Sequence, residues 1–117
     1  MNKRSVGGAT ASGVPSYIRS VGDALKPADR EYLKQKLDQK LGKFDPAVFR
    51  TSVRVEDVNG PRGGLDKRCR IKVVLNGLPT VVVEAHSQTL KGAMDTALAR
   101  MERSVRGATE RRRSISR

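Results

Sequence analysis

The side chains most able to do chemistry are few in this chain. It contains one His, His86, and one Cys, Cys69. A nucleophilic or acid-base site needs several such groups brought together, so the sequence favours a protein that is not an enzyme. His86 ends a Val-rich run, where a surface role is expected. Cys69 lies in an alternating apolar run and is expected to be a small buried residue.

The glycine-rich segment 59–64, Asn-Gly-Pro-Arg-Gly-Gly, resembles a phosphate cradle in composition only. No Gly-Lys-Ser/Thr follows it, and the next element has the pattern of a strand rather than a helix. Asp57 and Asp66 bracket the segment, but two carboxylates without His or Cys make a poor metal site. We interpret the segment as a turn anchored by these carboxylates, and we expect no metal and no cofactor.

The charge balance is the most informative property of the composition. The chain has 24 Lys plus Arg against 12 Asp plus Glu, a formal charge of +12 at 117 residues. Such an excess favours a polyanionic partner, either nucleic acid or an acidic membrane surface. No stretch approaches the ~20 apolar residues of a membrane span, and no secretion signal is visible. A cytoplasmic protein is therefore expected.

Aromatic residues are 3% of the chain and Trp is absent, so base stacking is not expected to be a main binding mode. We expect the core to take the two Phe. Contact with phosphates is the expected mode instead, and the basic residues are sorted rather than scattered. Residues 100–117 hold seven Arg against Glu102 and Glu110.

Apolar periodicity predicts the elements that position these charges. The predicted order is strand, helix, three strands and helix, at 14–21, 27–44, 48–56, 68–75, 80–85 and 90–113. In the strand from Val48, Phe49 and Val53 are expected to face the core. The dipeptide Asn76-Gly77 predicts a hairpin turn, and Ser87 or Thr89 can cap the last helix. The last three strands should form an antiparallel meander.

The predicted fold class is α+β, in the order β-α-β-β-β-α, with a four-stranded sheet and two helices packed on one face. A single domain is expected over 14–113. Residues 1–13 are expected to form a flexible leader, and 114–117 a frayed basic tail.

The two predicted helices carry basic residues along a flank of each apolar stripe, while Glu31 and Asp38 lie on the outward side of the first. Solvated helix faces would give the same pattern. Two helices side by side, however, can line a common groove with cations spaced for phosphates. The candidate RNA-binding residues are Lys36, Lys40, Lys43, Arg100, Arg103, Arg106, Arg111, Arg112 and Arg113. A rival basic surface is the exposed sheet face, with Arg50, Arg54, Arg70 and Lys72, partly offset by Glu56.

Three segments together resemble the ribosome hibernation-promoting factor and ribosome-associated inhibitor family, in its short form. They are KLDQKLGKF at 36–44, SVRVEDVNGPRGGLDKRCRIKVVL at 52–75 and AMDTALARMERSV at 93–105. The resemblance runs over 17–113. It implies a fold similar to a double-stranded-RNA-binding domain and binding to 16S rRNA in the decoding region of the small ribosomal subunit, in resting or stressed bacterial cells.

The resemblance also implies roles for particular residues. The basic end of the first helix falls on Lys36, Lys40 and Lys43, and the basic-apolar-acid-Arg pattern of the last helix falls on 100–103. Asp95 matches an acidic position. Two departures from the family pattern are expected: one extra residue in the first helix, and no additional domain after the second helix of the kind with which long members pair ribosomes.

Two alternatives stay open at this point. A general nucleic-acid coat or nucleoid protein would use the same charge without a specific site. A small hydrolase or metal enzyme is disfavoured because the convergent groups are missing. No membrane partner and no small-molecule substrate are expected.

Overall fold

The computed structural model of the chain describes residues 14–22, 24–59 and 65–116. The predicted leader at 1–13 and most of the glycine-rich segment lie outside these residues. The elements are β2 (Ser16–Val21), α1 (Pro27–Leu41), the 3-10 turn η1 (Gly42–Phe44), β3 (Val48–Asn59), β4 (Leu65–Leu75), β5 (Val81–Ser87) and α2 (Leu90–Ser116). This order confirms the predicted β-α-β-β-β-α fold.

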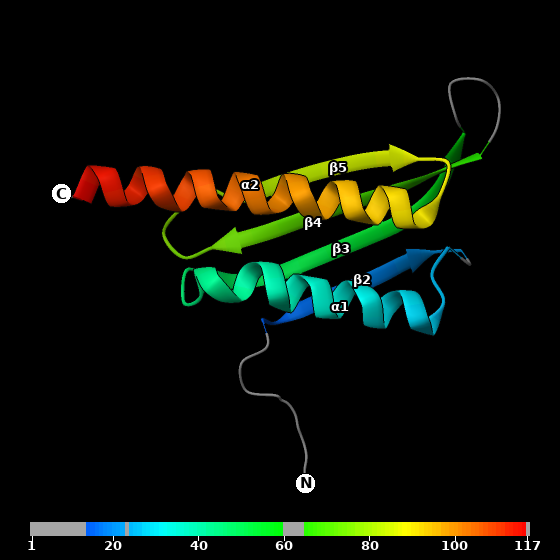
Figure 1. Cartoon of the computed structure of the whole chain (residues 1–117), viewed down its shortest axis with the longest axis horizontal. Coiled ribbons are helices and arrows are strands. Elements are labelled where there is room, and N and C mark those ends of the chain that lie inside the picture. Colours follow the sequence, from blue (N-terminus) through cyan, green and yellow to red (C-terminus); the bar gives the residue numbers. More distant parts are fainter. Residues whose placement is uncertain (1–13, 23, 60–64, 117) are drawn as a thin grey trace, which may run out of the picture.

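The strands form a single four-stranded sheet in the order β2-β3-β4-β5. β2 pairs parallel with β3, and α1 is the crossover between them. The pairs β3-β4 and β4-β5 are antiparallel, which confirms the predicted meander. Both helices lie on one side of the sheet and run in the same direction, with α1 over β2 and α2 over β4 and β5 (Figure 1). The other side of the sheet is uncovered by described elements.

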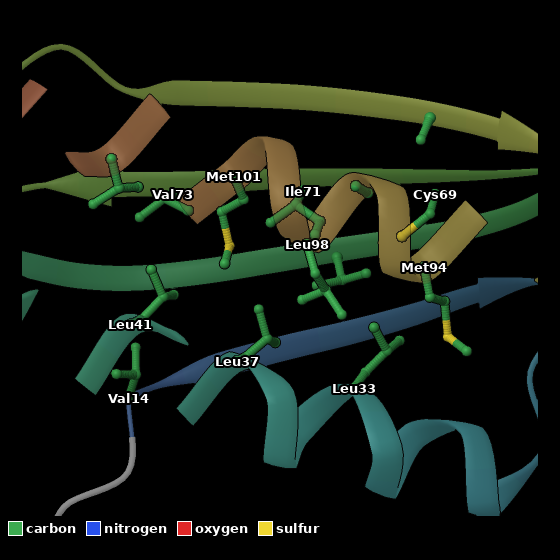
Figure 2. Close-up of a cluster of buried hydrophobic side chains, with 14 of the residues drawn as sticks. Val14, Leu33, Leu37, Leu41, Cys69, Ile71, Val73, Met94, Leu98 and Met101 are labelled. Carbon is green, nitrogen blue, oxygen red and sulfur yellow. The ribbon is translucent and has the colours of Figure 1, made fainter. Parts of the chain in front are cut away.

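The core fills the space between the helices and the sheet (Figure 2). The apolar stripe of α1 is fully buried, because Leu33, Leu37 and Leu41 recur once per turn on the side that faces the sheet. The sheet contributes alternate residues of β3 and β4, and α2 contributes its own stripe. The fully buried set includes Val53, Val55, Cys69, Ile71, Val73, Leu98, Met101 and Val105.

Cys69 is one of these core residues, as predicted. Burial raises the pKa of its thiol to about 12, so the group is neutral and acts as a small apolar side chain.

The prediction that Phe49 faces the core is wrong. The register between β3 and β4 shifts between Val48 and Arg50, which is the signature of a β-bulge. The extra residue reverses the alternation, so Val48 is buried while Phe49 is 56% exposed. The other phenylalanine, Phe44, is half-buried against the core as expected.

The turn at Asn76-Gly77 is present, and Gly77 has a φ of 72°, a conformation that glycine adopts without strain. The last helix begins after Thr89, whose hydroxyl accepts a hydrogen bond from the Gly92 amide at 3.1 Å. Its backbone stays helical through Ser116, and the fraying expected for 114–117 stays a prediction. No helix within the described ranges is long and apolar enough to cross a membrane.

Candidate nucleic-acid interface

The facing sides of α1 and α2 bring cations and carboxylates together in what we call the helix seam. Asp95 and Glu102 of α2 are seven residues apart, which places both on one side of that helix. Each is the centre of a small cluster of cations. The seam consists of Tyr32, Lys36, Lys40, Lys43, Phe44, Lys91, Asp95, Glu102 and Arg106.

Glu102 is shared by three cations. Lys40 Nζ lies 3.3 Å from its Oε1, Lys43 donates to its Oε2, and Arg106 Nη2 lies 3.4 Å from the same oxygen. The hydrogen bond from Lys43, followed by that from Lys40, lowers the pKa of Glu102 below its ordinary value. Glu102 is therefore ionised at neutral pH and holds cations of both helices in one place.

Asp95 organises the other end of the seam. It accepts a hydrogen bond of 2.5 Å from the Tyr32 hydroxyl and forms an ion pair of 3.2 Å with Lys91. The Tyr32 hydrogen bond is the main cause that lowers the pKa of Asp95. The ammonium groups of Lys91 and Lys36 lie 4.9 and 5.7 Å from the centre of the Tyr32 ring, within the range of a cation-π contact.

The seam ends beside Phe44, where η1 follows α1. Lys43 Nζ and the Arg106 guanidinium lie 5.8 and 5.9 Å from the centre of its ring. A hollow of about 350 Å³ opens here, with Lys43 and Arg106 in its wall. In total the seam holds five cations against two carboxylates and keeps a net positive charge.

The structure separates the predicted RNA-binding residues into groups. Lys36, Lys40, Lys43 and Arg106 meet in the seam. The expectation that Arg100 lines the same groove is wrong, because its Nη1 donates to the Glu84 carbonyl of β5 at 2.6 Å. β5 is the sheet edge furthest from β2, over which α1 lies, so this flank of α2 faces away from α1.

Arg111 and Arg112 of α2 also lie outside the seam. Arg111 is 11 residues after Arg100, which is close to three whole turns, and so lies on the same flank. Arg103 is exposed. Arg112 Nη1 donates to the Asn76 carbonyl at 2.7 Å, at the turn between β4 and β5. The side chain of Arg113 is outside the described residues.

Three seam residues were not singled out from the sequence as contact residues: Tyr32, Phe44 and Lys91. The spacing of Lys91, Asp95 and Glu102 at four and seven residues is a detectable signal for one helix face. The expectation that Asp38 lies on the outward side is also wrong. Asp38 is half-buried and accepts a hydrogen bond of 3.1 Å from the backbone amide of Val14. This bond connects α1 to the residues just before β2.

The residues considered for catalysis or metal binding lie apart from one another. His86 is exposed, with Nε2 3.8 Å from Glu84. Asp57 forms an ion pair of 2.5 Å with Lys67 across β3 and β4, close to the glycine-rich segment that it was expected to anchor. Within the described ranges, no group of three or more His, Cys, Asp or Glu could hold a metal ion.

The sheet face away from the helices, here called the open face, carries the rival basic residues. Pairing brings Arg19, Arg54 and Arg70 into register on three adjacent strands. On β5 the same row ends with Glu84, which is in register with Arg70. Glu84 forms an ion pair of 3.6 Å with Arg68, and its Oε1 lies 3.8 Å from His86 Nε2. A hollow of about 360 Å³ lies on this face, lined in part by the arginine row and by Tyr17, Ser52 and Lys72.

Fold and charge together define a small basic α+β domain whose paired helices present clustered cations. A family model described as "Sigma 54 modulation protein / S30EA ribosomal protein" matches residues 18–113, and the chain belongs to that family. This confirms the resemblance to the hibernation-promoting factor family drawn from the sequence. Membership of this family makes the chain a ribosome-associated factor.

Solved structures show the same fold. The N-terminal domain of Protein Y from Thermus thermophilus superposes with a TM-score of 0.62 at 26% identity, over 80% of this chain and 94% of that one. A ribosomal subunit interface protein from Coxiella burnetii gives a TM-score of 0.63 at 18% identity, over 80% and 96% of the two chains, and at this identity the likeness concerns the fold alone. A search of curated protein sequences finds no significant match.

Proposed function

We propose that this protein is a hibernation factor that binds the small ribosomal subunit, contacts 16S rRNA through the cations of its helices, and blocks the decoding region by occupying it. Membership of the family supports the ribosome as the partner. The observation that supports the helices as the contact surface is the helix seam, where cations from two helices converge around Glu102.

The proposed mechanism is electrostatic capture followed by shape matching. Rigid neighbouring helices hold Lys40, Lys43 and Arg106 within a few ångströms of one another, so a phosphate meets several donors at once. Glu102 keeps these cations ordered before binding, which reduces the entropy that binding must remove. Such contacts position the protein on the RNA backbone and read no base sequence. Arg103 and the arginines near the end of α2 extend the basic surface.

Co-sedimentation with purified small subunits tests the proposal. The test variant is Lys43→Gln with Arg106→Gln, because both side chains are 47% exposed and their loss leaves the core intact. We expect the wild-type protein to saturate near one copy per subunit, and the variant to bind at least about tenfold more weakly at physiological salt. The matched control is Lys26→Gln with Lys34→Gln, which removes the same charge from exposed positions outside the seam. It should bind nearly as well as the wild type.

Two results would contradict the proposal. Equal losses for both double variants would mean that net charge alone governs binding, as in a general nucleic-acid coat. Binding that does not saturate, or that is equally strong for a naked RNA duplex, would exclude a specific ribosomal site. Melting temperatures of all variants verify that the fold survives.

A further inference from the structure

The open face of the sheet contains a row of like charges in direct register. Arg19 of β2 pairs with Arg54 of β3, and Arg54 pairs with Arg70 of β4. Like charges directly opposite one another destabilise a sheet. Strands are about 4.8 Å apart, so three guanidinium groups share a strip about 10 Å wide. Repulsion within this row disfavours the folded state, and the packing of the core does not require it.

The protein supplies little internal compensation for this row. Within the described ranges only Arg54 has an ion pair, at 3.1 Å to Glu56, and Glu56 is shared with Arg68 at 2.7 Å. Among the residues that the structure describes, neither Arg19 nor Arg70 has an ion pair, and neither does the neighbouring Lys72, although Glu84 of β5 lies in register opposite Arg70. Glu56 and Glu84 instead both form ion pairs with Arg68, which lies one row further along the sheet. The strip beside Tyr17 therefore keeps its positive charge.

An exposed aromatic ring borders the same strip. Tyr17 lies two residues before Arg19 on β2, hence on the same face, and is 62% exposed. Its register partner is Ser52, whose partner in turn is Lys72. The short Ser52 side chain leaves the hollow between the ring and the lysine. Val82 of β5, opposite Lys72, is 47% exposed and extends this apolar floor.

We propose that the open face is a second binding site, for a segment of single-stranded RNA. In this site Tyr17 stacks on a base seated over Ser52, and the guanidinium groups of Arg19, Arg54 and Arg70 bind the adjoining phosphates. The combination of an exposed ring with unneutralised cations on a sheet is the chemistry by which proteins hold unpaired nucleotides. The proposal goes beyond the ribosomal function assigned to the helix seam and does not depend on it.

The occupant follows from the shape and chemistry of the face. A duplex keeps its bases stacked inside, so the Tyr17 ring would have no base to contact, and a curved duplex meets a flat sheet at few phosphates. An acidic peptide would satisfy the arginines but would not require an exposed ring beside them. Single-stranded RNA uses both features at once.

Fluorescence anisotropy with a labelled short oligouridine, in the absence of ribosomes, tests the site. Arg19→Gln with Arg70→Gln should weaken binding about tenfold through loss of two phosphate contacts. Tyr17→Ser should weaken it about five- to tenfold through loss of stacking, whereas Tyr17→Phe should leave it nearly unchanged. The control is again Lys26→Gln with Lys34→Gln, which should have little effect.

A measurement on the wild-type protein avoids any dependence on variant folding. In an amide-correlation NMR titration with the same oligouridine, shifts should concentrate on β2, β3 and β4 and spare the α1-α2 seam. Shifts confined to the helices would overturn the proposal. So would equal losses for the sheet and control variants, or tighter binding of an RNA hairpin duplex or of polyglutamate than of oligouridine. Ribosome co-sedimentation of the sheet variant, run in parallel, separates a failure here from a failure of the helix-seam proposal.

Discussion

The helix seam and the open face hold similar numbers of cations but arrange them in opposite ways. In the seam, Glu102 is shared by Lys40, Lys43 and Arg106, so each cation already has an anion from the protein itself. On the open face, arginines stand opposite arginines across three strands, and within the described ranges the only ion pair of these three arginines joins Arg54 to Glu56.

The two surfaces show that a high density of positive charge and a fixed arrangement of the cations are separate properties. The seam is ordered without a ligand because its own carboxylates fix the cations, at the expense of part of the net charge. The open face keeps more of its positive charge, and its arginines are held in position by the paired strands that carry them. The first surface is suited to matching a rigid shape, and the second to capturing a flexible polyanion.

The largest expected effect is a crossed pattern of affinities. Lys43→Gln with Arg106→Gln should reduce binding to the small subunit at least about tenfold and leave oligouridine binding within about twofold. Arg19→Gln with Arg70→Gln should reduce oligouridine binding about tenfold. Co-sedimentation and anisotropy on the same protein preparations measure both. If each double variant loses both ligands equally, the two surfaces are one unspecific polycation and the comparison fails.

The salt dependence of ribosome binding should follow from the number of seam contacts. With about five phosphate contacts, each contributing a slope of roughly −0.7, the log-log plot of affinity against salt should have a slope near −3 to −4. Removing two contacts with the seam double variant should make the slope shallower by about 1.4. Titrations of wild type and variant between low and physiological salt give both slopes. A slope near zero for the wild type would exclude electrostatic capture.

The sequence predicted the elements and most of the core, because local periodicity determines which residues of a helix or strand share a face. The stripe Leu33, Leu37, Leu41 and the alternation through Cys69 and Ile71 are of this kind. Phe49 could not be placed correctly, since one inserted residue at the bulge reverses the alternation and no local signal marks it. In the sequence, the alternation with a period of two continues across the bulge without interruption.

The candidate site was predicted only in part, because helix flanks and strand register are tertiary properties. Lys36, Lys40 and Lys43 were correctly grouped on one flank of α1, but nothing in α2 alone tells which of its flanks meets α1. Arg100 was therefore grouped with them, although it contacts β5. The arginine row likewise depends on the parallel pairing of β2 with β3 across the intervening helix, which the sequence does not specify.

Acid should loosen the seam. Hydrogen bonding to Lys43 and Lys40 lowers the pKa of Glu102 in the folded protein below the ordinary value of a glutamate. The stabilisation is therefore fully present above that value and is lost as pH falls through the lowered pKa. We expect Glu102→Gln to lower the melting temperature slightly at neutral pH and to lose this difference once the pH falls below the lowered pKa of Glu102. Thermal unfolding of both proteins across this range measures it. A difference that persists in acid would show that Glu102 acts through packing rather than charge.

Glu102→Gln, which should lower stability, should strengthen unspecific binding of RNA. Without the Glu102 carboxylate, the three seam cations lose their internal competitor, and unspecific RNA binding should rise about two- to threefold. Anisotropy with an RNA duplex gives this value. A fall in duplex affinity would mean that ordering of the cations by Glu102 outweighs the charge it removes.

The smallest expected effect lies on the open face and concerns stability alone. Arg19→Gln removes a charge that faces Arg54 and has no ion pair within the described ranges. The loss of this repulsion should stabilise the fold by about 0.5 kcal/mol, or raise the melting temperature by about 2 °C for a domain of this size. The gain should disappear in molar salt, where the Debye length is about 3 Å.

Lys72→Gln is the matched control, because its neighbours across the sheet are Ser52 and Val82, and removing its charge should change the melting temperature little. Differential scanning calorimetry at low and high salt distinguishes the two variants. If Arg19→Gln destabilises the protein at low salt while Lys72→Gln does not, the arginine row supports the sheet instead of straining it, and the contrast with the seam is lost.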